Sequence, residues 1–428
     1  MKQIMNRREL IKSILLASLA PSLHTLPAWA TPLNNKRRFF VMIRAANGWD
    51  VTLGLDPKVR GAGFEYSDMF IEYAPSEILK SGTLSFGPSA AALMPYASDL
   101  AVVNGVFMSD ANVSHPANLD YISTGDPEGR AADLPVEVSH AGNNGPFGVV
   151  FNQSLKRANR DIMPTRADNL LNLRSAADLT AFADYVSKLP DTGEMHRSQM
   201  ALLKNSAIQK DLLKSFDLVK DEITAGTSGS DTLSQTRKTA AVLAASFMSG
   251  AAMQGMIDIA VFLDTHAQHE KIHLQNQKQV WDSVAHVFKI FKSLPYGTGS
   301  LFDATTFMVV SEFARTPALN ASAGKDHNPL TNSVLLAGNG ILGGTSLGAS
   351  QLVLRKESGT GEPRHCASAM NFSTGQIAKT RAEAASDAFQ FIFPEHVAAT
   401  VATALNLDRT RFSSAPASLP ALDLILKK

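Results

Sequence analysis

TTFMVVSEFARTP, residues Thr305–Pro317, joins an apolar run to a group of charged side chains. The first six residues are apolar or β-branched, which is typical of a buried strand. Glu312 and Arg315 are therefore expected at or just beyond the carboxyl end of that strand, where open α/β sheets place their binding sites. Asp326-His327 follows after a short polar turn, and a carboxylate beside an imidazole offers two good donors to a borderline metal ion. The stretch predicts one strand of an α/β sheet and a chemical site at its end.

Apolar runs and helical patterns alternate along most of the remaining chain. The other predicted strands lie at 38–44, 100–106, 257–263 and 332–338. The predicted helices lie at 116–125, 240–256, 268–292 and 394–405. This alternation indicates an α/β fold with a mainly parallel sheet sandwiched by helices.

A helical pattern from about Ser175 to Gly226 interrupts the alternation and ends in a Gly/Ser/Thr-rich run. We interpret it as a helical insert spanning about 165–232 within a single domain, 31–428.

Residues 1–30 have the features of a twin-arginine export signal. Arg7-Arg8 precedes a weakly apolar stretch, and the small residues ending at Ala30 suit a cleavage site. An ordinary amphipathic helix is the alternative. The signal predicts a periplasmic or secreted protein, and because this route exports folded chains, a metal bound before export would fit it.

The composition excludes several classes of protein. The chain is 45% hydrophobic and 18% charged, as expected for a globular protein. Basic and acidic residues nearly balance, which argues against a nucleic-acid partner. Cys366 is the only cysteine, so no intramolecular disulfide is possible.

The apolar run Thr239–Leu263 is better explained by a helix leading into a strand than by a membrane span, so we predict no transmembrane anchor after signal cleavage.

Charged residues and histidines follow several of the predicted strands. These candidates are Asp50, Asp264 and His266 with His269 nearby, Glu312, and Asp326 with His327. Because loops at the carboxyl ends of parallel strands meet at one sheet edge, we expect these side chains to converge on a shared cation.

Each candidate also has a simpler explanation. Asp50 could cap a turn, and Glu312 with Arg315 could form only an ion pair. Asp326 could cap the next element. His266, His269 and His273 have the spacing of one polar helix face, which for His273 is the favoured interpretation.

Several motifs together resemble the exported bacterial family known as domain of unknown function 1501, which is similar to the alkaline phosphatase and sulfatase superfamily. They are Arg7-Arg8, Asp264-Thr265-His266, EFARTP from Glu312, Asp326-His327, LLAGNGILGG from Leu335 and PEHVAAT from Pro394. The resemblance implies strand-end loops that hold one or two divalent metal ions, zinc, calcium or magnesium, beside a nucleophile.

The resemblance also implies roles for individual residues. The implied metal ligands are Asp50, Asp264, His266 or His269, Asp326, His327 and His365. The nucleophile of the superfamily commonly lies ten residues before a Thr-Gly glycine, and counting back from Gly125 gives His115, with Ser114 just before it. Ser114 or His115 would then attack, while Arg315 would neutralise an anionic substrate and Glu312 would hold a cation or orient a water molecule.

Two functions remain open at this point. The first is an exported metal-dependent hydrolase of phosphate or sulfate esters, acting on an anionic small molecule or glycan ester. The second is a non-catalytic exported protein that binds a metal, a glycan or a co-exported partner protein, as the changed nucleophile position permits.

Overall fold

The computed structural model describes residues 38–59, 74–142, 145–173, 175–188, 200–355, 362–412, 416 and 418–427. The predicted export signal, residues 1–30, lies outside these ranges. The described residues belong to one compact unit, Arg37–Lys428.

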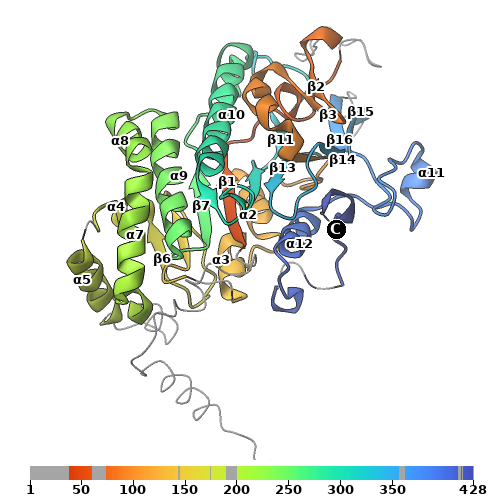
Figure 1. Cartoon of the computed structure of the whole chain (residues 1–428). Helices are drawn as coiled ribbons and strands as arrows, with labels where there is room; N and C mark the ends of the chain where they lie inside the picture. The colour runs from red at the N-terminus through yellow and green to blue at the C-terminus, as the bar shows by residue number, and fades with distance from the viewer. Residues whose placement is uncertain are drawn as a thin grey trace, which may run out of the picture. The chain divides into compact units, whose positions relative to one another are not determined.

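A central sheet of eight strands organises this unit (Figure 1). Its order is β14-β4-β13-β10-β1-β7-β5-β6. The strands are β1 (Phe39–Arg44), β4 (Leu100–Asn104), β5 (Val149–Phe151), β6 (Pro164–Arg166), β7 (Gln254–Asp258), β10 (Thr305–Val310), β13 (Ser333–Gly338) and β14 (Thr345–Leu347). All neighbouring pairs are parallel except those of β13, which runs antiparallel to both β10 and β4. The predicted mainly parallel α/β sheet is confirmed.

Both faces of the sheet are buried under helices. Phe39, Val41 and Ile43 of β1 point into one apolar cluster, while Phe40 and Met42 point into the other. Helices α9 (Thr232–Ser249) and α10 (His269–Ser293) and the 3-10 segment η3 (Pro88–Asp99) cover the first face. Helices α2 (His115–Thr124), α3 (Leu134–His140) and α12 (Pro394–Ala404) cover the second. Burial on both faces explains why β1 is apolar from Phe39 to Ile43.

Three further helices stack against α9 at the β6 end of the sheet, and a fourth, α5, packs on one of them, α7 (Figure 1). They are α4 (Ala167–Leu171), α5 (Ala176–Ser187), α7 (Ser206–Leu218) and α8 (Lys220–Ser228), and they fall in the stretch where we predicted a helical insert. Small two-stranded ribbons complete the fold: β2 (Leu79–Ser81) with β3 (Leu84–Phe86), β8 (Pro295–Tyr296) with β9 (Gly299–Ser300), β11 (Ala314–Arg315) with β12 (His327–Asn328), and β15 (Ser350–Arg355) with β16 (Glu362–Ala367). The remaining helical pieces are α11 (Arg381–Ala384), η1 (Val51–Leu53), η2 (Pro75–Glu77), η4 (Arg409–Arg411) and η5 (Asp423–Ile425).

One boundary prediction was wrong. Helix α9 ends at Ser249 because Gly250 adopts a left-handed conformation, φ 73°, which stops a helix. The next strand, β7, consequently starts at Gln254, and residues 259–263 leave the sheet instead of continuing it. Among the described residues, no helix is long and apolar enough to cross a membrane.

Strand direction brings distant loops to one edge of the sheet. Strands β1, β4, β7 and β10 point the same way, so the segments that follow them emerge together. Strand β13 points the opposite way, so the segment that precedes it reaches this edge as well. The loops that carry Asp50, His115, Asp264, Glu312 and His327 therefore share one side of the molecule.

Candidate metal centre

The first part of the site is His115, the first residue of α2. Its Nδ1 lies 2.5 Å from Oε1 of Glu312, a buried carboxylate that also accepts a hydrogen bond from the backbone N–H of Asn47 at 2.7 Å. Its Nε2 lies 3.3 Å from Oδ1 of Asp264 and has no hydrogen-bond partner among the described residues. Glu312 thus fixes the ring and leaves Nε2 directed at Asp264.

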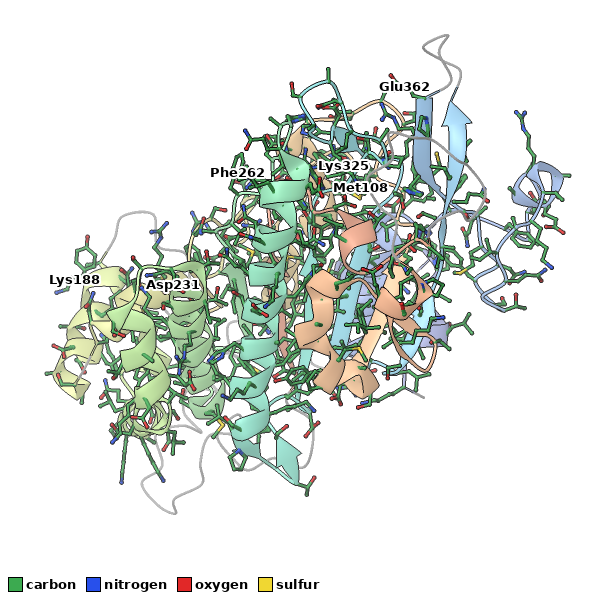
Figure 2. All side chains as sticks on the ribbon, turned by 90° about the horizontal axis from the view of Figure 1, so that it is seen from above. Met108, Lys188, Asp231, Phe262, Lys325 and Glu362 are labelled. Atoms are coloured by element: carbon green, nitrogen blue, oxygen red, sulfur yellow. The ribbon has the colours of Figure 1, made fainter. Side chains whose placement is uncertain are left out.

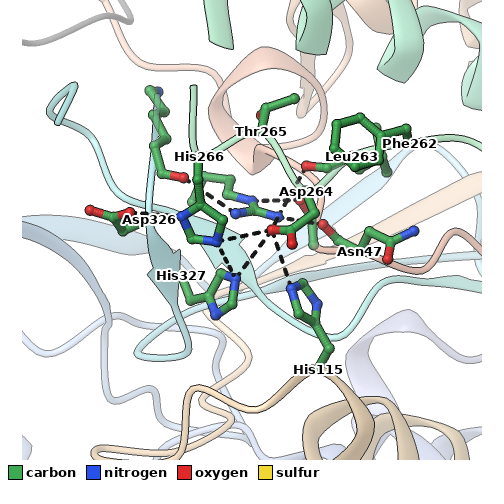
Figure 3. Close-up of polar contacts among 12 residues, drawn as sticks. Asn47, His115, Phe262, Leu263, Asp264, Thr265, His266, Asp326 and His327 are labelled. Atoms are coloured by element: carbon green, nitrogen blue, oxygen red, sulfur yellow. Dashed lines mark hydrogen bonds and ion pairs between the residues drawn. The ribbon is translucent and has the colours of Figure 1, made fainter. Parts of the chain in front are cut away.

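Two more imidazoles point at the same carboxylate oxygen (Figure 3). Nε2 of His266 lies 3.1 Å from Oδ1 of Asp264, and Nε2 of His327 lies 3.3 Å from it. His266 directs its Nδ1 at Oδ1 of Asp326, 2.8 Å away, and His327 directs its Nδ1 at the carbonyl oxygen of Val113, 2.7 Å away. We refer to His115, Asp264, His266 and His327 as the imidazole cluster.

The outer partners determine which ring nitrogen carries the proton. A carboxylate or carbonyl oxygen can only accept, so each Nδ1 in the cluster must be the donor. In a neutral ring the proton on Nδ1 leaves Nε2 with a lone pair. Burial lowers the pKa of His327, which favours the neutral ring there. The cluster therefore aims lone pairs of imidazole nitrogens at a carboxylate oxygen.

The spacing within the cluster is that of metal ligands. A tetrahedral ion bound at about 2.0–2.1 Å separates its ligand atoms by about 3.3 Å. The separations from Oδ1 of Asp264 are 3.1–3.3 Å, and the Nε2 atoms of His266 and His327 are 2.9 Å apart. If Nε2 of His266 carried a proton, it could donate to Nε2 of His327, but Nε2 of His115 would still have no partner. A cation among these atoms would bind all three Nε2 lone pairs and the carboxylate oxygen together. His115, Asp264 and His327 also form a geometric metal-binding group by themselves.

Arg315 supports the cluster from the protein interior. Its fully buried guanidinium donates to Oδ1 of Asp264 at 2.8 Å and to the carbonyl oxygens of Gly48, Leu263 and Lys325 at 2.9–3.3 Å. Partial burial alone would raise the pKa of Asp264, but the hydrogen bond and charge of Arg315 outweigh it and hold that pKa far below its usual value. The buried guanidinium is directed at the protein and not at solvent, contrary to the expectation that it neutralises a substrate anion.

Asp50 does not join the cluster. Its Oδ2 lies 2.7 Å from Nζ of Lys325, and both side chains are fully buried. Burial alone would raise the pKa of Asp50, yet the ammonium group of Lys325, with the hydrogen bond from His269, holds it well below its usual value. The expectation that Asp50 ligates the shared metal therefore fails, because a lysine already neutralises this carboxylate.

His269 and His273 form a buried hydrogen-bond network with Thr265 and Asp50. Nε2 of His269 lies 3.1 Å from Oδ2 of Asp50, so it carries the proton and its Nδ1 accepts from the hydroxyl of Thr265 at 2.7 Å. The same hydroxyl oxygen must then accept from Nδ1 of His273 at 2.8 Å, and Nε2 of His273 accepts from the backbone N–H of Asp50 at 3.0 Å. Burial lowers the pKa of both rings. His269 is thus a buried structural residue and is not part of the imidazole cluster.

The remaining predicted residues lie in other roles. Asp326 is half-exposed and orients His266 from behind. Ser114 is an exposed residue preceding α2, and its side chain does not cap the helix. His365 is buried on β16, where burial lowers its pKa to about 4, and its ring nitrogens have no hydrogen-bond partner among the described residues. Among the described residues, no hydrogen bond therefore joins the His365 ring to the imidazole cluster.

Sequence reasoning missed the importance of three residues. Lys325 is the buried partner of Asp50, Thr265 links two histidines, and Asn47 connects the first strand-end loop to Glu312. A lysine or threonine in a polar loop does not look buried from its sequence. Their positions could have indicated a role, because Thr265 lies between Asp264 and His266 and Lys325 precedes Asp326.

Comparisons with known proteins give distant structural likenesses. No curated protein matches the chain. A lipoteichoic acid synthase, LtaP, from Listeria monocytogenes is 8% identical, with 77% of this chain and 72% of that chain covered and a TM-score of 0.35. A putative sulfatase from Bacteroides thetaiotaomicron is 9% identical, with 92% and 76% covered and a TM-score of 0.37. The C-terminal periplasmic domain of EcEptC from Escherichia coli is 10% identical, with 92% and 91% covered and a TM-score of 0.34.

A family model gives the clearer result. It matches residues 149–363, which is half of the chain and includes three of the four residues of the imidazole cluster: Asp264, His266 and His327. The family carries the description "Protein of unknown function (DUF1501)". The resemblance drawn from the sequence motifs is thereby confirmed, and the chain belongs to the DUF1501 family.

Proposed function

We propose that the chain is an exported metal-dependent hydrolase of phosphate or sulfate esters whose metal ion is held by the imidazole cluster. The observation that carries the proposal is the convergence of Nε2 of His115, His266 and His327 on Oδ1 of Asp264. Each of the three rings is held from behind by an acceptor on Nδ1, an arrangement that raises the basicity of metal-bound histidines.

The donor set favours zinc over the other candidate metals. Three imidazole nitrogens and one carboxylate oxygen suit zinc, whereas calcium and magnesium prefer shells of oxygen ligands. When bound, such an ion supplies a Lewis acid and lowers the pKa of a bound water.

An anion is favoured beside the cluster by α2. This ten-residue helix begins at His115, so the positive end of its dipole lies at the site. Phosphate and sulfate groups carry the negative charge that this arrangement stabilises. The cluster is partly open to solvent, since the Asp264 side chain is 32% exposed and that of His266 is 45% exposed.

Water is the attacking group in this proposal. Nδ1 of His115 is bound to Glu312 and its Nε2 faces the cluster as a proposed metal ligand, so His115 is neither a free nucleophile nor a base for Ser114. Ser114 is exposed and does not cap α2, and the described contacts give its hydroxyl no activating partner. Glu312 and Asp326 act as positioning residues that hold His115 and His266.

The experiment combines metal analysis of the purified protein with a panel of aryl phosphate and aryl sulfate esters. We expect about one zinc ion per chain and turnover of at least one ester class. We expect His327→Ala to lose both, since changing a residue that merely orients a ligand already weakens metal binding about 10–100-fold. His286→Ala is the matched control, because His286 lies on α10 and pairs with Glu222 away from the cluster. A wild-type protein without metal, or a metal-loaded His327→Ala variant, would contradict the proposal.

A non-catalytic metal- or glycan-binding protein is the second candidate. The observation in its favour is that four protein ligands can fill a tetrahedral shell, as they do in structural zinc sites. Stoichiometric zinc with no turnover of any ester in the panel would support this candidate.

A further inference from the structure

A pocket of about 400 Å³ opens beside the imidazole cluster, between the ends of β1 and β7 and helix α2. Three of its lining residues adjoin the cluster. Asn47 donates its backbone N–H to Glu312, the carboxylate that holds His115. Leu119 lies one turn after His115 on α2, and Phe262 precedes Asp264 by two residues. A group bound in this pocket would thus lie next to a group held at the cluster (Figure 3).

The side wall of the pocket is apolar and open to solvent. Leu119, Val261 and Phe262 line it, and the Phe262 ring is 61% exposed. An exposed phenylalanine in a concave surface leaves apolar area that a ligand can cover.

The far end of the pocket carries no free positive charge. Arg44 is the only cation among the described lining residues, and it is paired with Asp258 through Nε–Oδ1 at 2.6 Å and Nη2–Oδ2 at 3.0 Å. Asp133 lies 3.7 Å from Nη1 of Arg44 and adds a second carboxylate. The electrostatic balance at this end therefore disfavours a second anion.

We infer that this pocket binds the leaving group of the ester and that the leaving group is an uncharged, partly apolar alcohol or phenol with one ring. The inference rests on the proposed function, which places the anionic phosphate or sulfate at the cluster. Hydrolysis breaks the bond from phosphorus or sulfur to the bridging oxygen and forms one to the water oxygen. The alcohol leaves with a proton that the water supplied. The pocket is at the small end of ligand sites, which span about 300–1,000 Å³.

Binding of non-hydrolysable analogues tests the pocket separately from catalysis. Phenylphosphonate and methylphosphonate share one anionic group and differ in the ring, as do benzenesulfonate and methanesulfonate. With the zinc-loaded wild-type protein we expect calorimetry to show about tenfold tighter binding of the phenyl member of at least one pair, because burying the ring removes apolar surface from water. We expect Phe262→Ala to reduce this preference to about threefold or less while binding of the methyl member stays unchanged.

Tyr185→Ala is the matched control, since Tyr185 is another exposed aromatic residue, 66% exposed, on α5. Figure 2 shows Lys188, the residue after α5, at the far end of the helical layer from Phe262. A wild-type protein that binds no analogue, or shows no phenyl preference in either pair, would overturn the inference. So would a preference that survives Phe262→Ala. If the protein prefers the phenyl analogues but does not hydrolyse phenyl phosphate or phenyl sulfate, the pocket binds the ring but the proposed hydrolase activity is wrong. The test therefore separates a failure of the pocket from a failure of the proposed function.

Discussion

At the scale of the residue, the pair Asp50–Lys325 places two opposite charges in the interior beside the loops of the imidazole cluster. Both side chains are fully buried, and their atoms lie 2.7 Å apart. Lys325→Met would leave the Asp50 carboxylate without its cation in a site that water does not reach. We expect the free energy of unfolding to fall by about 3–5 kcal/mol, the usual result of breaking a buried ion pair. Urea unfolding at pH 7 measures it.

Two further variants separate charge from packing. The double variant Asp50→Asn/Lys325→Met should recover part of the loss, because it removes both charges. Lys278→Met is the exposed control, since Lys278 pairs with Asp282 on the surface of α10, and its cost should be at most about 1 kcal/mol. If Lys325→Met and Lys278→Met lowered the free energy of unfolding equally, the buried ion pair would contribute no more to stability than the exposed one.

Asp133 gives the protein a distinct dependence on pH. Burial raises the pKa of this carboxyl from 3.8 to about 6, despite the nearby charge of Arg44. Between these values the folded state keeps a proton that the unfolded state has lost. The stability contributed by the protonated group is therefore complete below pH 3.8 and is lost as the pH rises through about 6.

Asp133→Asn removes this titration and keeps an oxygen that can accept from the backbone N–H of Lys156. We expect the stability of the variant, relative to wild type, to increase by about 2–3 kcal/mol between pH 4 and pH 7. Urea unfolding of both proteins across this range measures the difference. A difference that does not change with pH would be incompatible with a raised pKa.

These residue-scale features also mark the limit of what the sequence predicts. The residue types at the strand ends drew attention to Asp264, His266 and His327, whose side chains lie together in the structure, whereas His115 entered only through the resemblance to the superfamily. They could not show that Asp50 faces a lysine, because whether a carboxylate meets a metal or an ammonium group depends on packing within a few ångströms. Nor could they show that the His365 ring is buried on β16 without a hydrogen-bond partner among the described residues.

At the scale of the element, two loops from distant parts of the chain are joined directly below the cluster. The backbone N–H of His269 donates to the carbonyl oxygen of Ala323 at 2.8 Å, and Ala267 forms a β-bridge with Ala323. Gly324 lies so close to the other loop that a Cβ there would be 1.9 Å from the carbonyl carbon of His266. The two loops thus approach only because residue 324 has no side chain.

Gly324→Ala should therefore separate the loops that carry His266 and His327. We expect the variant to lose most of its zinc at micromolar metal and to be less stable than wild type. Gly344→Ala is the control, because a Cβ at Gly344 meets nothing within 4 Å although φ is +72°. It should cost about 1–2 kcal/mol through its left-handed backbone and leave zinc binding unchanged. Zinc titration of both variants measures their affinities. A wild-type zinc affinity in Gly324→Ala would contradict the idea that close approach of the two loops forms the site.

The elements themselves were largely predictable. Apolar β-branched runs correctly indicated β1, β4, β10 and β13, because strands buried on both faces read as continuous hydrophobic sequence. The short strands β5 and β6 were missed, since three-residue runs carry too little pattern. The antiparallel direction of β13 was not predictable either, because the pattern of a strand is the same in both directions.

At the scale of the whole molecule, the proposed metal ligands come from loops at three strands and a helix. His115 follows β4, Asp264 and His266 follow β7, and His327 precedes β13. Bound metal should therefore stabilise the entire sheet against unfolding. At zinc concentrations about 100 times the dissociation constant, the expected gain is about 2.7 kcal/mol.

Differential scanning calorimetry of the wild-type protein with zinc and after chelation measures this gain. His327→Ala should show no such difference, because it lacks one ligand. A stabilisation of the same size in the variant would indicate that zinc acts elsewhere on the protein.

The order of the ligands along the chain has a consequence for biosynthesis. No short peptide contains more than Asp264 and His266, and His327 is added when three quarters of the polypeptide has been made. A growing chain therefore cannot capture the ion during early translation. With the proposed ligands, metal acquisition would mark the completion of folding, and the cellular compartment in which folding finishes would decide which metal supply the protein meets.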